Sequence, residues 1–169
     1  AEVVDDNGVT VTIATPARRI VSLAPHATEL VFAAGAGERL VGVVARSDWP
    51  AAARALPRIG DVHALDLERV FALKPDLVVA TPAGNRHETF DQLERLNIPV
   101  FLVNPVGVSD VLDAIGRLGR LTEQVEAADR TVATMRARIE TVTTPGHATD
   151  SRKPKKVAFH RSVPSNIGP

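Results

Sequence analysis

Three histidines, His26, His63 and His87, fall in segments that we expect to be loops. Imidazole is a common ligand of cobalt, iron and zinc, so these residues raise the hypothesis of a metal site. The sequence has no short-range ligand pair such as His-Glu-x-x-His, and a lone loop histidine is more often solvated or engaged in a polar contact. We therefore assign no residue to a metal centre and no cofactor to the protein, and we expect His26 and His63 to contact a bound molecule.

Two arginines and one aromatic residue in similar segments could recognise a small molecule. Arg46 and Arg86 suit an anionic ligand through charge-assisted hydrogen bonds, although each is equally explained as an ordinary surface residue. Trp49 is the only tryptophan. Its indole could stack on a flat ligand, or it could cover its own loop against a neighbouring helix.

A catalytic function lacks the residues that it would need. Ser22 and Ser47 are not in a Gly-x-Ser-x-Gly elbow, and no phosphate-binding loop is present. The Gly35 and Gly37 pair ends an expected helix, whereas a dinucleotide fingerprint would begin one. The acidic residues are scattered through turns and helix starts, where capping explains them. We predict no catalytic residue and no enzyme activity.

The rest of the chain supplies the elements that position these residues. Compact apolar runs at 20–24, 40–45, 77–81 and 100–103 predict fully buried strands. Helices are expected between them: one capped by Thr28 and ended by Gly35, one capped by Asp66, and one over 88–96. A turn at 5–8 followed by alternation at 9–13 predicts a short hairpin before the first strand. The repeated β-α order predicts an α/β fold, a Rossmann-like lobe with a central parallel sheet flanked by helices.

Ligands of open α/β sheets bind outside the carboxyl ends of the strands. In this sequence those ends lead into the segments 25–28, 46–50, 82–87 and 104–107. His26, Arg46, Trp49 and Arg86 all belong to these segments, so we expect them at one edge of the sheet.

The chain changes character after residue 108. Apolar residues spaced alternately by three and four continue from Val111 to Val142, which predicts a long helical region. Gly116 and Gly119, with Thr122 as an N-cap, divide it into two helices, the second running to about residue 143. Coiled-coil dimerisation is the rival explanation of the stripe. We expect an N-terminal α/β lobe at 1–108, a helical backbone at 109–144, and a linker with the first strand of a second lobe at 145–169.

Bulk composition excludes several classes of protein. Lys plus Arg and Asp plus Glu number 20 each, which gives no global field toward nucleic acid or an acidic membrane. The chain has no cysteine, which excludes disulfide scaffolds and thiol catalysis. No apolar run approaches the roughly 20 residues that cross a bilayer. The sequence opens at Ala1 without a leader, as expected of an exported protein in its mature form.

Several segments together resemble the helical-backbone class of periplasmic solute-binding proteins, closest to the branch that binds cobalamin. They lie at 19–25 with 28–30, at 41–43 with 47–50, at 56–57 with 59–60, and at 66–70 with 73–78. The resemblance covers the first lobe, the helix and one strand of the second lobe. It implies two α/β lobes joined by a rigid helix, with a ligand held in the cleft between them.

The resemblance also implies ligand, partner and location. The expected ligand is a small-molecule metal complex, a corrinoid by preference, with haem or an iron–siderophore complex as the alternative. The cobalamin branch often places aromatic rings where this chain has Arg46, Val62 and Thr81, and these three departures count against cobalamin specifically. Thr81 is included among the predicted ligand contacts. Glu68 matches the acidic residue through which such lobes dock on an ABC permease in the inner membrane, and the location would be periplasmic. A further alternative is a truncated lobe that self-associates through its helix stripe.

Overall fold

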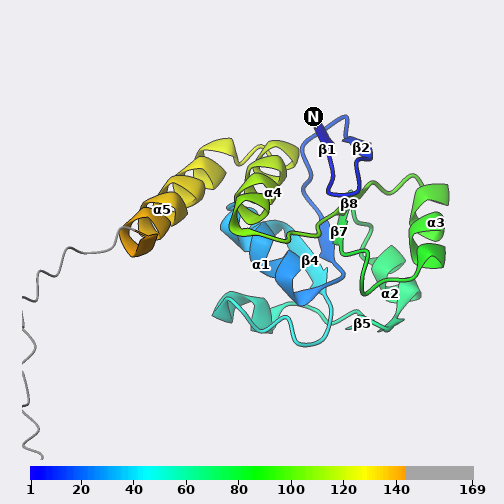
Figure 1. Ribbon diagram of the computed structural model, residues 1–169. Coiled ribbons are helices and arrows are strands. Elements are labelled where there is room, and N and C mark those ends of the chain that lie inside the picture. Colours follow the sequence, from blue (N-terminus) through cyan, green and yellow to red (C-terminus); the bar gives the residue numbers. More distant parts are fainter. Residues whose placement is uncertain (144–169) are drawn as a thin grey trace, which may run out of the picture.

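The computed structural model describes residues 1–143, and its centre is a parallel sheet of four strands (Figure 1). The strands are β3 (Ile20–Ser22), β4 (Leu40–Val43), β7 (Leu77–Ala80) and β8 (Val100–Leu102), and they lie in the order β4-β3-β7-β8. All three pairings are parallel. The four predicted strands are confirmed, each ending one or two residues earlier than expected. The predicted fold class is therefore confirmed.

Alternate residues of the strands feed two separate cores, one on each face of the sheet. Ile20, Leu77 and Val79 join the core beneath α1 (Pro25–Ala33) and α4 (Val108–Leu121). Val21 and Val78 join the opposite core beneath α2 (Leu67–Ala72) and α3 (His87–Arg95). This period of two in strands that are buried on both faces is the pattern of a parallel sheet covered by helices.

The starts of the helices test the predicted caps. Asp66 caps α2, because its carboxylate accepts the backbone N–H of Arg69 at 3.0 Å. The expected cap at Thr28 is wrong: α1 begins at Pro25, whose fixed φ and missing N–H suit the first helical position. Thr28 lies inside the helix, fully buried. The third helix begins at His87, one residue before the predicted start.

Short hairpins flank the sheet. β1 (Glu2–Val4) and β2 (Thr10–Thr12) pair antiparallel, as the turn at 5–8 predicts. Asp6 fastens this hairpin to the lobe, because its carboxylate lies 2.5 Å from Nη2 of Arg117 and accepts the backbone N–H of Asn104 at 2.6 Å. A second hairpin, β5 (Gly60–Asp61) and β6 (Ala64–Leu65), precedes α2. Two short 3₁₀ helices, η1 (Gly37–Arg39) and η2 (Ala51–Ala55), flank β4 along the chain.

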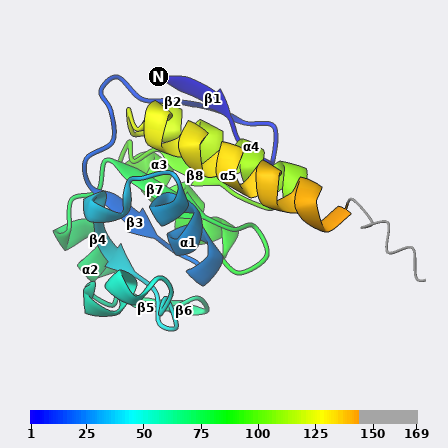
Figure 2. The same cartoon turned by 90° about the vertical axis from the view of Figure 1, so that its left-hand side faces the viewer.

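The helical region forms an antiparallel pair, α4 and α5 (Val125–Thr143), which lie side by side in both views (Figures 1 and 2). The predicted N-cap at Thr122 is wrong, because Thr122 ends α4 and its hydroxyl donates to the carbonyl of Leu118 at 2.7 Å. Arg39 also donates to the Thr122 carbonyl. The pair is close at Gly119, which faces Ala128: a Cβ on Gly119 would lie 2.5 Å from Cβ of Ala128.

Much of the apolar stripe is therefore used inside the lobe. Ala114, Leu118, Leu121 and Ala128 are buried in the same core as the sheet, so α4 is part of the lobe. Ala128, in the first half of α5, is fully buried, whereas Val142, near its end, is 84% exposed. No helix within residues 1–143 has the length and apolar character that a bilayer crossing requires. The expected linker and strand at 145–169 lie outside the described residues.

Candidate functional site

The carboxyl ends of the four strands form one edge of the sheet, from which the loops lead into the helices. The chain runs from β3 to β4 on one side and then crosses to β7 on the other, so β3 and β7 are neighbours at a switch point of the topology. Open α/β sheets bind ligands in the crevice at such a point. His26 follows β3 and Thr81 follows β7, which places both residues here.

The loop 46–50, which follows β4, brings Arg46 and Trp49 to the same edge. Arg46 is exposed and has a φ of 65°, in the left-handed region that a non-glycine residue rarely adopts. Trp49 is 65% exposed. An indole with so little packing of its own leaves a large apolar face available for stacking on a ligand.

His63 and Arg86 meet in a shallow pocket of about 250 Å³ between the β5–β6 hairpin and the start of α3. Val62 and Leu67 supply part of its apolar lining, and Glu88 adds a carboxylate. The two residues are 23 positions apart in the chain, and only the packing of the hairpin on α3 joins them. The pocket can hold one polar substituent of a larger molecule against a cation and an imidazole.

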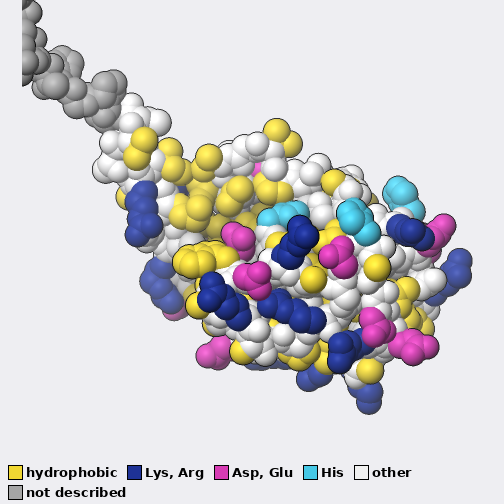
Figure 3. Space-filling model, turned by 90° about the horizontal axis from the view of Figure 1, so that it is seen from below, with side chains coloured by type: hydrophobic (Ala, Val, Ile, Leu, Met, Phe, Trp, Pro, Cys, Tyr) yellow, Lys and Arg dark blue, Asp and Glu magenta, His cyan; other side chains and the backbone are white. Residues whose placement is uncertain are grey.

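The face seen from below carries histidine side chains from its middle toward one edge, with basic and acidic side chains between them (Figure 3). His26, His63 and His87 are all exposed. His87 packs edge-to-face on Phe90 with ring centroids 6.5 Å apart. Within residues 1–143 no three histidine or acidic side chains come close enough to hold a metal ion. Hydrophobic side chains gather on the part of this face nearest the grey segment (Figure 3).

Thr81 differs from the expectation for a ligand contact. It is only 7% exposed, and its backbone N–H donates to Oδ1 of Asn85 at 3.4 Å. The buried amide of Asn85 also reaches the carbonyls of Leu23 and Val62, both at 3.5 Å. Asn85 thus connects the ends of two strands to the β5–β6 hairpin. Sequence reasoning missed this role, because an asparagine near a glycine is equally typical of a turn.

Glu68 lies in the first turn of α2, where a carboxylate also favours the helix dipole. It is exposed, and among residues 1–143 it forms no ion pair. Its negative charge is available to a partner surface.

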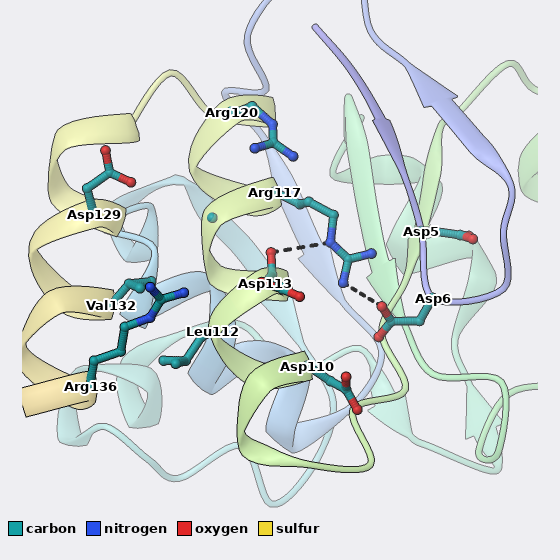
Figure 4. A pocket seen from close by; sticks show the side chains of 11 residues that line it. Asp5, Asp6, Asp110, Leu112, Asp113, Arg117, Arg120, Asp129, Val132 and Arg136 are labelled. Carbon is teal, nitrogen blue, oxygen red and sulfur yellow. Dashed lines mark hydrogen bonds and ion pairs between the residues drawn. The ribbon is translucent and has the colours of Figure 1, made fainter. Parts of the chain in front are cut away.

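A second hollow lies away from this edge, between the β1–β2 turn, α4 and α5 (Figure 4). Its volume is about 590 Å³, and acidic and basic side chains alternate around it. Arg117 points across it to Asp6 and also donates to the Asp113 carbonyl at 3.2 Å (Figure 4). Because Arg117 pairs with Asp6 of the β1–β2 turn, we interpret the hollow as the joint that holds the hairpin on α4.

Comparison with known proteins identifies relatives of this chain. The vitamin B12-binding protein of Vibrio campbellii is 38% identical over 125 residues, which are 74% of this chain and 46% of that protein. The vitamin B12-binding protein of Yersinia pestis is 36% identical over 129 residues, 76% of this chain and 46% of the relative. This chain therefore spans about half the length of the curated relatives that it matches.

Solved structures show the same relationship. The periplasmic vitamin B12 binding protein of Vibrio cholerae superposes with a TM-score of 0.70 at 35% identity, over 75% of this chain and 50% of that one. A periplasmic heme binding protein from Pseudomonas aeruginosa gives a TM-score of 0.67 at 28% identity, over 74% and 45% of the two chains. The family model described as periplasmic binding protein matches residues 20–162. The chain belongs to the periplasmic binding protein family.

Proposed function

We propose that this chain is the N-terminal lobe and connecting helix of a solute-binding protein that binds a corrinoid in the periplasm and delivers it to an ABC permease. The protein acts by binding and not by catalysis. The observation that carries the proposal is the exposed Trp49 at the carboxyl edge of the sheet, in a chain whose curated relatives include vitamin B12-binding proteins. A corrinoid offers a broad, flat ring system on which an indole can stack.

The arrangement of the edge supports this ligand class. Trp49 provides an exposed apolar face, while Arg46, His26 and the His63–Arg86 pocket provide exposed polar groups. A mostly apolar contact with a few placed polar groups is typical of small-molecule sites. The antiparallel return of α5 leads the chain back toward this edge, where a second lobe would close the cleft.

Haem or an iron–siderophore complex is the second candidate, and a specific observation favours it. The exposed positions at this edge include two arginines, Arg46 and Arg86, and guanidinium groups pair with carboxylates in bidentate geometry. The likeness to a periplasmic heme binding protein supports the same ligand class.

Calorimetric titration of the chain with cyanocobalamin, haemin and a ferric siderophore separates these ligands. Trp49→Ala should lower the affinity for the preferred ligand by roughly tenfold, because a stacked aromatic side chain contributes about 0.5–1.5 kcal/mol beyond its buried area. Leu96→Ala is the matched control, since Leu96 is 54% exposed and follows α3 at the amino edge of the sheet. Absence of binding to all three ligands, or equal loss in both variants, would contradict the proposal.

A further inference from the structure

The exposure of Trp49 poses a physical problem for recognition. A ring that is 65% exposed gains little orientation from its own contacts, so its direction depends on the backbone that carries it. A loop that orders only when a ligand arrives lowers the affinity by the entropy that it loses. The structure fixes loop 46–50 from two sides.

On one side, loop 46–50 is held by a chain of buried hydroxyl groups. Oγ1 of Thr28 lies 2.9 Å from Oγ of Ser22 and 3.2 Å from Oγ of Ser47. Ser22 donates to the carbonyl of Ala24 at 2.9 Å. Each of the three hydroxyl residues is at most 1% exposed. Because hydroxyls both donate and accept, these groups satisfy one another and join the loop to β3 and α1.

On a second side, loop 46–50 is held by one guanidinium group. Nη1 of Arg58 donates to the carbonyl of Ser47 at 3.0 Å and to that of Val44 at 3.3 Å. Nη2 donates to the carboxylate of Asp48 at 3.1 Å. Arg54 adds a bond from Nε to the Asp48 carbonyl at 3.2 Å. The residues immediately before Trp49 are therefore fixed by hydrogen bonds, although Trp49 itself is exposed.

The anchor of Arg58 is itself rigid. Its backbone is paired beside β4, where the Val43 N–H donates to the carbonyl of Pro57 and the Ile59 N–H donates to that of Val43, at 2.9 and 3.0 Å. The carbonyl of Arg58 accepts Nη1 of Arg69 at 2.9 Å. The guanidinium group of Arg58 thus connects the edge of the sheet to loop 46–50.

We propose that Arg58 is a positioning residue, which together with the hydroxyl chain of Ser22, Thr28 and Ser47 holds loop 46–50 in one conformation before ligand binds. Trp49 and Arg46 then meet the ligand already oriented. The identity of that ligand rests on the proposed function, whereas the fixed loop can be measured in the ligand-free protein. A planar fork is required, because one group must reach two carbonyls and a carboxylate in different directions, which the single ammonium of lysine does not do.

Time-resolved fluorescence anisotropy of Trp49 tests the positioning role directly, since the chain has one tryptophan. The variants are Arg58→Lys, which keeps the charge, and Ser47→Ala, which removes the hydroxyl contact. The control is Arg95→Ala, which removes an exposed arginine at the end of α3. Circular dichroism and thermal unfolding of each variant establish that the lobe remains folded.

The expected result is a lower residual anisotropy of Trp49 in both loop variants and an unchanged decay in Arg95→Ala. Identical anisotropy decays in all folded variants would overturn the inference. In the same proteins, the affinity for cyanocobalamin or haemin should fall by about three- to tenfold in Arg58→Lys, as expected when one loop and its side chains must be ordered on binding.

The two measurements separate this inference from the proposed function. A looser Trp49 loop with unchanged affinity would show that Arg58 shapes the loop without aiding recognition, which also overturns the inference. If the unaltered chain binds none of the probes, the proposed function fails, and the anisotropy still decides whether Arg58 holds the loop.

Discussion

The packing of α5 on the lobe can be tested at two glycines of the same helix. Gly116 and Gly119 both lie inside α4, so alanine at either position should gain about 1 kcal/mol of helix propensity. Their surroundings differ. A Cβ on Gly116 meets nothing within 4 Å, whereas a Cβ on Gly119 lies 2.5 Å from Cβ of Ala128. Carbon atoms pack comfortably at about 3.5–4.0 Å, so α5 must move away by roughly 1 Å in Gly119→Ala.

The magnitude follows from these two terms. Overpacking a well-packed contact costs about 1–3 kcal/mol. Gly116→Ala should therefore stabilise the lobe by nearly the full propensity gain, while the same gain in Gly119→Ala is cancelled or exceeded by the clash. The two variants should differ by about 1–3 kcal/mol in the free energy of unfolding. Because they share the propensity term, the difference isolates the contact between the helices.

Urea denaturation followed by circular dichroism measures this difference, and thermal unfolding gives a second reading of about 2–4 °C for each kcal/mol in a chain of this size. Equal stabilisation by both substitutions would refute the reasoning, because it would mean that α5 does not rest on Gly119.

Two other predictions concern charged residues. The backbone N–H groups of Gly107 and Val106 donate to the Asp110 carboxylate, both at 3.0 Å, and these bonds lower its pKa below the ordinary value of 3.8. The ionised Asp110 carboxylate therefore stabilises the folded protein above pH 3.8, and this contribution is lost as the pH falls through the lower pKa that Asp110 has in the folded protein. Asp110→Asn should flatten the acid limb of a plot of unfolding free energy against pH, and an unaltered slope would contradict this. Glu68→Arg should reduce the ability of the protein to stimulate ATP hydrolysis by the ABC permease that we propose as its partner, in proteoliposomes, by about tenfold or more, because it reverses a proposed docking charge. Glu94→Arg makes the same charge change on the exposed surface of α3, so equal effects of both variants would exclude a specific docking role.

The strands and one helix cap were predictable because their signals are local. The apolar run at 77–81 is long enough for a buried strand, and β7 occupies its first four residues. Asp66 precedes an apolar-periodic segment and can reach the N–H three residues later without any help from the rest of the fold. Thr28 looked equivalent, yet its hydroxyl contacts Ser22 and Ser47, which are placed by two different strands.

The position of several candidate residues at one edge of the sheet was predictable for the same reason. The rule that ligands bind at the carboxyl ends of strands correctly brings His26, Arg46 and Trp49 to one edge once the strands are known. The rule does not predict which side chains are buried, and Thr81 is buried. The roles of Asn85 and Arg58 depend on hydrogen bonds across the fold, for which the sequence offers no distinctive pattern.

The sequence by itself determined the α/β class, the parallel sheet and the edge that carries the candidate residues, because each follows from the spacing of residues along short segments. Only the tertiary structure decided which of those residues meet. Three features each join separate elements: the pocket lined by His63 and Arg86, the hydrogen bonds from Arg58 to loop 46–50, and the packing of α5 on Gly119. Such contacts depend on how the elements pack against one another, to within about 1 Å. The spacing of residues along the chain does not specify that packing.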